Sequence, residues 1–185
     1  MARVTGVYKP GDYPGVPDEA TRKDLQELFE QMFPGQRDPQ FDAAHAGWAI
    51  MAQNPRLALY MTKLTTYIAR DMPWCLRRDL RELLIQTVNL HFKCESSFHA
   101  RFPHAVTAGI SAELQAAIPY WRTTRSFDDE QRLVIEYTFA AAAGDVADEL
   151  FERVVQKYGE TQAIEFTAAI AHWSFWAIFL NATRP

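Results

Sequence analysis

The side chains best suited to chemistry gather in residues 81–111, where a carboxylate, amides, a thiol, imidazoles and a guanidinium fall within one expected pair of helices. Glu82, Gln86, Asn89 and Lys93 recur at intervals of four, three and four. They therefore lie on one face of the first helix, which is otherwise rich in Leu, Ile and Val. A carboxyl group on such a helix can exchange a proton with a substrate carbon or a water. Glu82 is the first catalytic candidate, with Gln86 beside it as a substrate-binding candidate.

Cys94 stands where the second helix of this pair could begin. A thiol at a helix N-terminus lies against unpaired backbone N–H groups and the positive end of the helix dipole, which favour the thiolate. A cysteine with no second thiol beside it is more often a small buried hydrophobic residue. The pattern thus leaves two roles open for Cys94, a catalytic nucleophile or part of a pocket wall.

Three further polar residues follow Cys94 along the second helix. Arg101 can hold a substrate carboxylate by a two-pronged hydrogen bond, and Ser97 lies one turn before it. His99 is a candidate acid or base. His172, in the last expected helix, is a second such candidate and is expected to face a pocket and bind substrate. Both histidines are equally compatible with a purely structural role.

The chain has 185 residues, of which 48% are hydrophobic and 23% charged. This length and composition are typical of a globular protein of one domain, or at most two small ones. A net charge of −4 argues against a general nucleic-acid-binding surface. Apolar stretches such as Leu133–Ala143 are too short to span a bilayer, and the first residues lack the apolar core of a secretory signal. These features predict a cytoplasmic protein that binds neither nucleic acid nor membrane.

Cysteine and histidine spacing gives no sign of a disulfide framework or a metal site. Cys75 and Cys94 lie far apart and form no CxxC motif, so two reduced thiols are the simpler interpretation. The five histidines show neither HxxxH nor HExxH spacing. We therefore expect neither a metal nor another cofactor.

Apolar residues recur with helical spacing along nearly the whole chain, and no segment alternates as a strand does. The sequence predicts an all-α protein that begins with an extended arm over Met1–Val16. Helices are expected at about 17–32, 41–53, 54–71, 77–92, 94–108, 111–118, 127–144, 145–158 and 161–181. Pro103 should kink or split the fifth of these. The last helix is apolar around most of its circumference, which indicates a central helix or one shared with another chain.

Three short motifs are spaced as in a known family: Arg81-Glu82-Leu83, Cys94-Glu95 and Gly109-Ile110-Ser111. With the helices that follow them, they make the chain resemble the carboxymuconolactone decarboxylase and alkylhydroperoxidase D-like proteins. The resemblance covers roughly 54–185, and residues 1–53 are similar to the N-terminal arm and helical extension of some members. It implies an all-helical bundle assembled as a homotrimer or homohexamer. It also implies that Glu82 and Cys94 share one pocket near the subunit contacts.

Two departures from the family pattern bear on function. The peroxidase-like branch has Cys-x-x-Cys followed by a His, whereas this chain has Ser97 at the second Cys position and Arg101 at the His position. A serine cannot resolve a peroxidatic cysteine by forming a disulfide, so activity of the usual peroxidase kind is disfavoured. In the decarboxylase-like branch a His often stands just before or at the Arg101 position. His99 lies two positions before Arg101, which rotates it by about 200° around an ideal helix, so the resemblance does not assign it the same role.

The resemblance therefore favours the decarboxylase-like branch: a cofactor-free lyase, isomerase or hydrolase that acts on a small carboxylated or lactone-like metabolite by acid–base chemistry. Two alternatives stay open. One is a single-cysteine peroxidase or thiol redox protein that depends on Cys94. The other is a non-catalytic, oligomeric helical binding module, which a pocket filled by Phe92, Phe98 and Phe102 would support.

Overall fold

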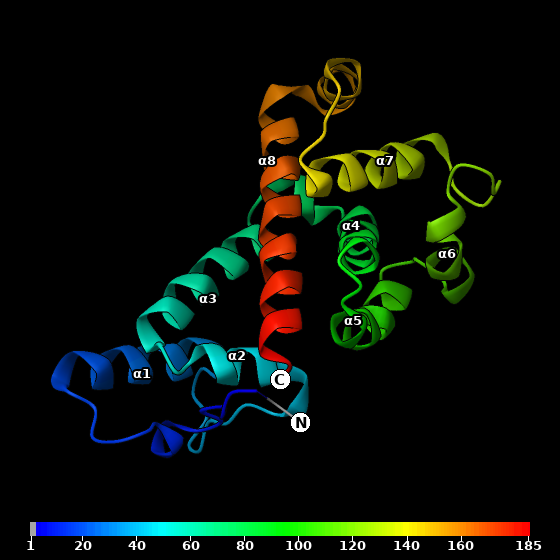
Figure 1. Cartoon of the computed structure of the whole chain (residues 1–185). Coiled ribbons are helices and arrows are strands. Elements are labelled where there is room, and N and C mark those ends of the chain that lie inside the picture. The colour runs from blue at the N-terminus through cyan, green and yellow to red at the C-terminus, as the bar shows by residue number, and fades with distance from the viewer. Residues whose placement is uncertain (1–2) are drawn as a thin grey trace. The chain divides into compact units, whose positions relative to one another are not determined.

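The computed structural model describes residues 3–185, and every regular element within this range is a helix, as the sequence predicts. The α-helices are α1 (Glu19–Met32), α2 (Ala46–Met51), α3 (Pro55–Arg70), α4 (Arg78–His91), α5 (Glu95–Thr107), α6 (Ala112–Ala117), α7 (Asp129–Ala143) and α8 (Asp148–Thr183). Short 3-10 helices are η1 (Pro10–Asp12), η2 (Ala43–His45), η3 (Pro73–Leu76) and η4 (Ile118–Tyr120). Figure 1 shows their order along the chain. The start of the expected arm, residues 1 and 2, lies outside the described range.

The chain divides into two compact units. Unit 1 comprises the residues up to Tyr67 together with Phe179–Pro185, and unit 2 comprises Ile68–Ile178. The boundary expected after residue 53 falls inside unit 1. In unit 1, Asp18 caps α1 by accepting a hydrogen bond from the Thr21 backbone N–H at 2.7 Å.

Ion pairs join α1 to α3 within unit 1. Arg56 pairs with Asp24 at 2.9 Å and Lys63 pairs with Glu27 at 2.7 Å. The face of α3 that carries most of its large apolar side chains is exposed, with Tyr60 63% accessible. Helical spacing of apolar residues predicts this helix, but it does not tell whether other residues cover its apolar side chains. The exposed members are Leu57, Tyr60, Leu64 and Tyr67.

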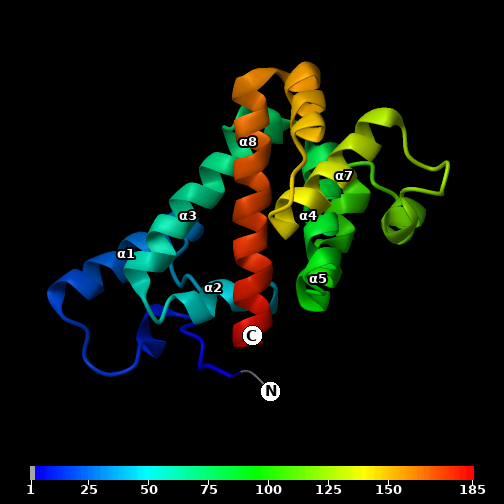
Figure 2. The same ribbon diagram turned by 45° about the horizontal axis from the view of Figure 1, so that its top comes forward.

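The central helix of unit 2 is α4, which lies between α5 and α7 (Figures 1 and 2). It is buried around its whole circumference, so it must bury polar as well as apolar side chains. Its buried residues are Leu80, Glu82, Leu83, Leu84, Ile85, Gln86, Thr87, Val88 and Asn89. The position of α4 fixes where the candidate site lies, since three of these residues belong to the polar stripe that spacing singles out. The fourth predicted member, Lys93, lies beyond the end of α4 and has a positive φ.

Two of the expected helices differ in the structure. Pro103 does not split the helix that contains it, since α5 runs as one helix from Glu95 to Thr107. The loss of one backbone donor is tolerated within it. The helix expected over 41–53 is reduced to η2 and the short α2. Phe41 instead packs as an aromatic side chain against Phe29, with ring centres 4.9 Å apart.

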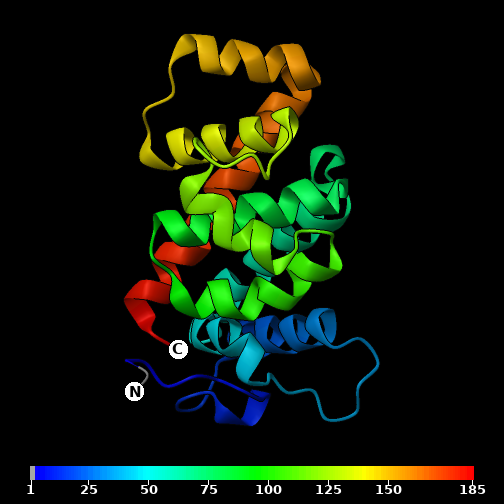
Figure 3. The same cartoon turned by 90° about the vertical axis from the view of Figure 1, so that its right-hand side faces the viewer.

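The last helix, α8, contains a sharp bend at Gly159, where the backbone has φ 79° and ψ 162° (Figures 1 and 3). The two helices expected around this glycine are therefore two limbs of α8, residues 148–158 and 160–183. By length and composition α8 is long and apolar enough to cross a membrane, whereas the apolar stretches of the sequence were expected to be too short. The core helix of a soluble protein meets the same criterion.

Replacing Gly159 by alanine should destabilise the protein, because this region of φ and ψ is accessible almost only to glycine. We expect Gly159→Ala to lower the free energy of unfolding by about 1–3 kcal/mol in urea denaturation. Gly11 is the matched control, since its φ is not positive and a Cβ there would meet no atom within 4 Å. Equal effects of Gly159→Ala and Gly11→Ala would contradict the role of the bend.

Candidate functional site around Glu82

Glu82 is a buried carboxylate, 2% exposed, on the central helix α4. Arg101 of α5 reaches it with two nitrogens: Nε donates to Oε2 at 3.2 Å, and Nη2 donates to Oε1. This is the two-pronged geometry in which a guanidinium binds a carboxylate most strongly. The sequence predicts such a fork for Arg101 with a substrate carboxylate as its partner. In the structure its partner is Glu82.

A second guanidinium approaches Glu82 from its own helix. Arg81 Nη2 lies 3.4 Å from Glu82 Oε1, while Arg81 Nη1 donates to the backbone carbonyls of Ala69 at 2.5 Å and Cys75 at 3.3 Å. Arg81 is therefore tied to the chain that precedes α4. Two guanidinium groups thus lie within ion-pair distance of Glu82.

An aromatic side chain from α8 completes the cluster. The guanidinium carbon of Arg101 lies 5.4 Å from the ring centre of Trp173, within the range of a cation–π interaction. The Arg101 side chain stays 26% exposed, whereas the Glu82 side chain is 2% exposed. A small molecule arriving from solvent would thus meet Arg101 first and Glu82 behind it.

The remaining polar residues of the α4 stripe form a hydrogen-bonded amide network. Gln86 Nε2 donates to Gln115 Oε1 at 2.6 Å and to the Phe98 carbonyl at 3.2 Å, and Gln86 Oε1 accepts from Asn89 Nδ2 at 3.0 Å. Gln115, in α6, donates onward to the Ile110 carbonyl at 3.0 Å. These bonds satisfy buried polar atoms and tie α4 to α5 and α6. We assign Gln86 a structural role on this geometry.

Cys94 is the N-cap residue of α5, where the spacing predicts it, but its side chain is fully buried. Its Sγ lies 3.8 Å from Ser96 Oγ. Cys75 is buried as well, and burial raises the pKa of its thiol to about 12. Both cysteines are free thiols. Ser97, one turn before Arg101, is half-buried.

The two histidine candidates lie in opposite environments. His99 is exposed on α5, and its ring contacts the edge of Phe98 with centres 6.0 Å apart. This agrees with the rotation that separates it from Arg101 on the helix. His172 is buried on α8, 5% exposed, and burial lowers the pKa of its imidazole to about 4. A neutral His172 is therefore expected at neutral pH.

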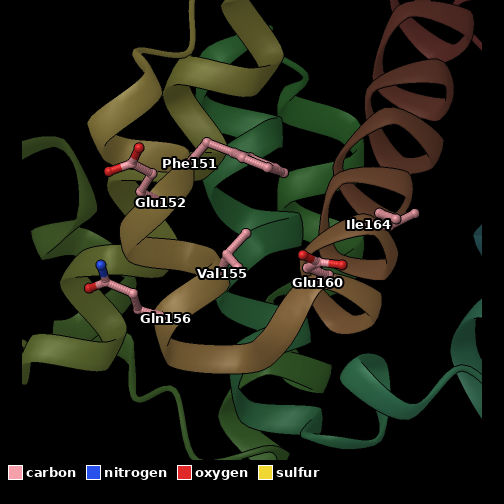
Figure 4. Close-up of a pocket in the computed structure, with 6 residues that line it drawn as sticks. All are labelled: Phe151, Glu152, Val155, Gln156, Glu160 and Ile164. Atoms are coloured by element: carbon pink, nitrogen blue, oxygen red, sulfur yellow. The ribbon is translucent and has the colours of Figure 1, made fainter.

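Three surface hollows occur elsewhere, and none of them is lined by Glu82. The one at the bend of α8 has a volume of about 540 Å³. Figure 4 shows Phe151 and Val155 on its first limb and Glu160 and Ile164 on its second. Another is bordered by the start of α4 and the end of α5, and the third lies along α1 and α3. Within residues 3–185, no three His, Cys, Asp or Glu side chains are grouped to hold a metal ion.

Sequence reasoning missed two members of the site, Arg81 and Trp173. Arg81 is part of the Arg-Glu-Leu motif, so its place beside Glu82 could have been noticed. Trp173 is noticeable only as one of several aromatic residues in the last helix, and nothing local connects it with Arg101. Comparisons of the chain with protein-family models, with curated proteins and with solved structures found no match.

The low pKa of His172 predicts how stability depends on pH. Between pH 6.5 and about 4 the unfolded chain binds a proton that the folded chain does not, so the free energy of unfolding falls as the pH falls through this window. The shift corresponds to about 3 kcal/mol. We expect urea denaturation of the His172→Gln variant to show a correspondingly smaller loss between pH 7 and pH 4. The exposed His99 provides the matched control, and equal slopes for His172→Gln and wild type would contradict the assignment.

Burial of both cysteines predicts that neither thiol reacts in the native protein. With a thiol-specific disulfide reagent at pH 8, we expect no fast reaction until denaturant is added, and then two reactive thiols. Cys75→Ser and Cys94→Ser should each remove one of them. A fast native reaction that disappears in Cys94→Ser would show an accessible thiol and would favour the redox alternative.

Proposed function

We propose that this protein is a cofactor-free enzyme similar to the carboxymuconolactone decarboxylase-like family, a lyase, isomerase or hydrolase acting on a small carboxylated or lactone-like metabolite. The observation that carries the proposal is the pairing of buried Glu82 with the partly exposed Arg101. Arg101 occupies the position where the family's peroxidase-like branch has a histidine. Contact between the side chain at that position and Glu82 thus supports a site that contains both residues.

The pair suggests a division of roles. A substrate carboxylate that binds Arg101 competes with Glu82 for the guanidinium, because one fork cannot fully bind two carboxylates. Glu82 then has a lone pair free to take a proton from a carbon next to the substrate carbonyl; the C–H electron pair becomes a C=C bond, and the carbonyl π pair moves onto oxygen. In a substrate with a second C=C bond conjugated to this enolate, return of the proton to the far carbon re-forms the carbonyl, shifts the double bond and completes an isomerisation. Arg101 stays protonated throughout, so Glu82 is the proton carrier.

A non-catalytic binding module is the second candidate, and one observation favours it. Both oxygens of Glu82 already accept hydrogen bonds from Arg101, which is also the pattern of a purely structural buried ion pair. The single-cysteine redox alternative has less support, because Cys94 is fully buried.

We further propose that the chain assembles as a homotrimer or homohexamer in the cytoplasm. Large exposed apolar side chains on α3 and α8 support assembly, including Tyr60 at 63%, Ile164 at 66% and Ile178 at 54% accessible. Two free thiols in one short chain suit a reducing compartment.

Exchange of carbon-bound hydrogen in D₂O tests the enzyme directly, because it needs no knowledge of the product. A set of small oxo acids and lactone acids is incubated with the protein, and loss of each C–H signal is followed by proton NMR. We expect at least one compound to exchange, and Glu82→Gln to slow that exchange by about 100-fold or more. Arg101→Lys keeps the positive charge but loses the two-pronged hydrogen bond. It should lower kcat/KM for the exchange, chiefly by raising KM.

Glu113→Gln is the matched control, since Glu113 is an exposed carboxylate of the same unit. The amide proton spectrum of each variant verifies that it is folded. Absence of exchange for the whole set, or exchange that is unchanged in a folded Glu82→Gln variant, would overturn the proposed chemistry and leave the binding module.

A further inference from the structure

The bend of α8 at Gly159 creates a hollow on the surface of unit 2. In a continuous helix the residues before and after Gly159 would follow one axis, but here the backbone leaves the helical region and the second limb departs at an angle. The hollow is lined by residues of both limbs and has a volume of about 540 Å³. Small-molecule sites usually measure roughly 300–1,000 Å³, so this one has room for a ligand.

Three pairs of residues line the hollow, and the members of each pair lie four positions apart on one face of their limb. They are Phe151 with Val155, Glu152 with Gln156, and Glu160 with Ile164. In Figure 4 the side chains of Phe151 and Val155 point from the first limb toward the second, whereas Glu152 and Gln156 point away from the second limb. The lining is therefore mostly apolar, with one carboxylate from each limb.

The two carboxylates of the hollow are not compensated by nearby cations. No Lys, Arg or His lines the hollow, and neither glutamate forms an ion pair within residues 3–185. The basic side chains of the first limb are paired elsewhere, Arg153 with Glu136 at 2.9 Å and Lys157 with Glu130 at 3.6 Å. Two unpaired negative charges beside an apolar surface attract a cation that has an apolar body.

The apolar part of the hollow is open to water, with Phe151 39% and Ile164 66% exposed. A ligand that covers these side chains removes apolar surface from water. A second copy of the chain docked through the same face would bring four carboxylates together, and like charges in an interface are unfavourable. A small cation with an aliphatic chain meets both requirements without that repulsion.

We propose that the hollow at the bend of α8 binds a hydrophobic amine in its protonated form. The alkyl chain covers Phe151 and Ile164, and the ammonium group pairs with Glu160 at the start of the second limb. Glu152 adds a second negative charge from the first limb. None of these residues belongs to the Glu82 cluster, so this site does not depend on the proposed enzymatic function.

Three probes with the same chain length and different head groups test the proposal: octylammonium, 1-octanol and octanoate. Binding is followed at pH 7 through the isoleucine and valine methyl signals in proton–carbon NMR spectra. The Ile164 signal is identified by its absence in Ile164→Gln. We expect octylammonium to shift the Ile164 and Val155 signals in a saturable way. Octanoate should bind roughly 10-fold more weakly or not at all, because the carboxylates repel it.

Two variants separate the charge from the apolar surface. Glu160→Gln keeps the shape but removes the charge, so it should weaken octylammonium about 5-fold and leave 1-octanol unchanged. Ile164→Gln should weaken both probes. Glu149→Gln is the matched control, since Glu149 is an exposed carboxylate of the same limb that does not line the hollow. It should change neither affinity, and the methyl spectrum reports whether each variant is folded.

Three results would overturn the inference. The first is an Ile164 signal that does not respond to octylammonium, or responds equally to octanoate. The second is an equal effect of Glu160→Gln and Glu149→Gln on octylammonium affinity. The third is a set of methyl signals that shift when the protein alone is diluted but not when octylammonium is added, which would show that a second copy covers the hollow.

Discussion

Unit 2 depends on one constraint: its central helix is buried on all sides and yet carries a charged carboxylate. A lone buried charge would cost more than the unit could compensate, so Glu82 must be paired. Arg101 supplies the pair from α5, and Arg81 adds a weaker contact at 3.4 Å from α4 itself. Arg101 in turn rests on the ring of Trp173 in α8. The positions of α4, α5 and α8 relative to one another thus depend on pairing the buried charge of one side chain, Glu82.

The amides of α4 impose a second requirement of the same kind. Gln86 is completely buried and is satisfied only because Asn89, Gln115 and the Phe98 carbonyl lie in the right places. A partly satisfied buried network is worse than an apolar core, so these bonds fix one arrangement of α5 and α6 against α4. Arg101 therefore comes from a helix whose position is set by groups other than the ion pair itself. Preorganisation of this type is what a binding site needs.

Local features of the fold could be predicted from the sequence because they depend on residues that are close together along the chain. The intervals of Glu82, Gln86 and Asn89 gave their common face, and the order of residues placed Cys94 at the start of the next helix. Features that depend on tertiary contacts could not be predicted in this way. Helical spacing predicted α3 without telling that Tyr60 stays exposed, and no local pattern links Arg101 to a tryptophan on α8. The partner of Arg101 was missed for the same reason, although the fork itself was predicted.

Arg101 stands where the peroxidase-like branch of the family that the sequence resembles has a histidine, and this difference changes what the glutamate must do. A histidine near neutral pH can both take and give a proton, whereas a guanidinium keeps its charge at any working pH. Nor can His99 or His172 readily fill the gap: the first is exposed on another face of α5, and the second is held neutral by burial. Proton transfer at this site would then fall to Glu82 alone. Chemistry in which one group removes and returns the same proton fits that limit, while a reaction that needs a separate acid and base does not.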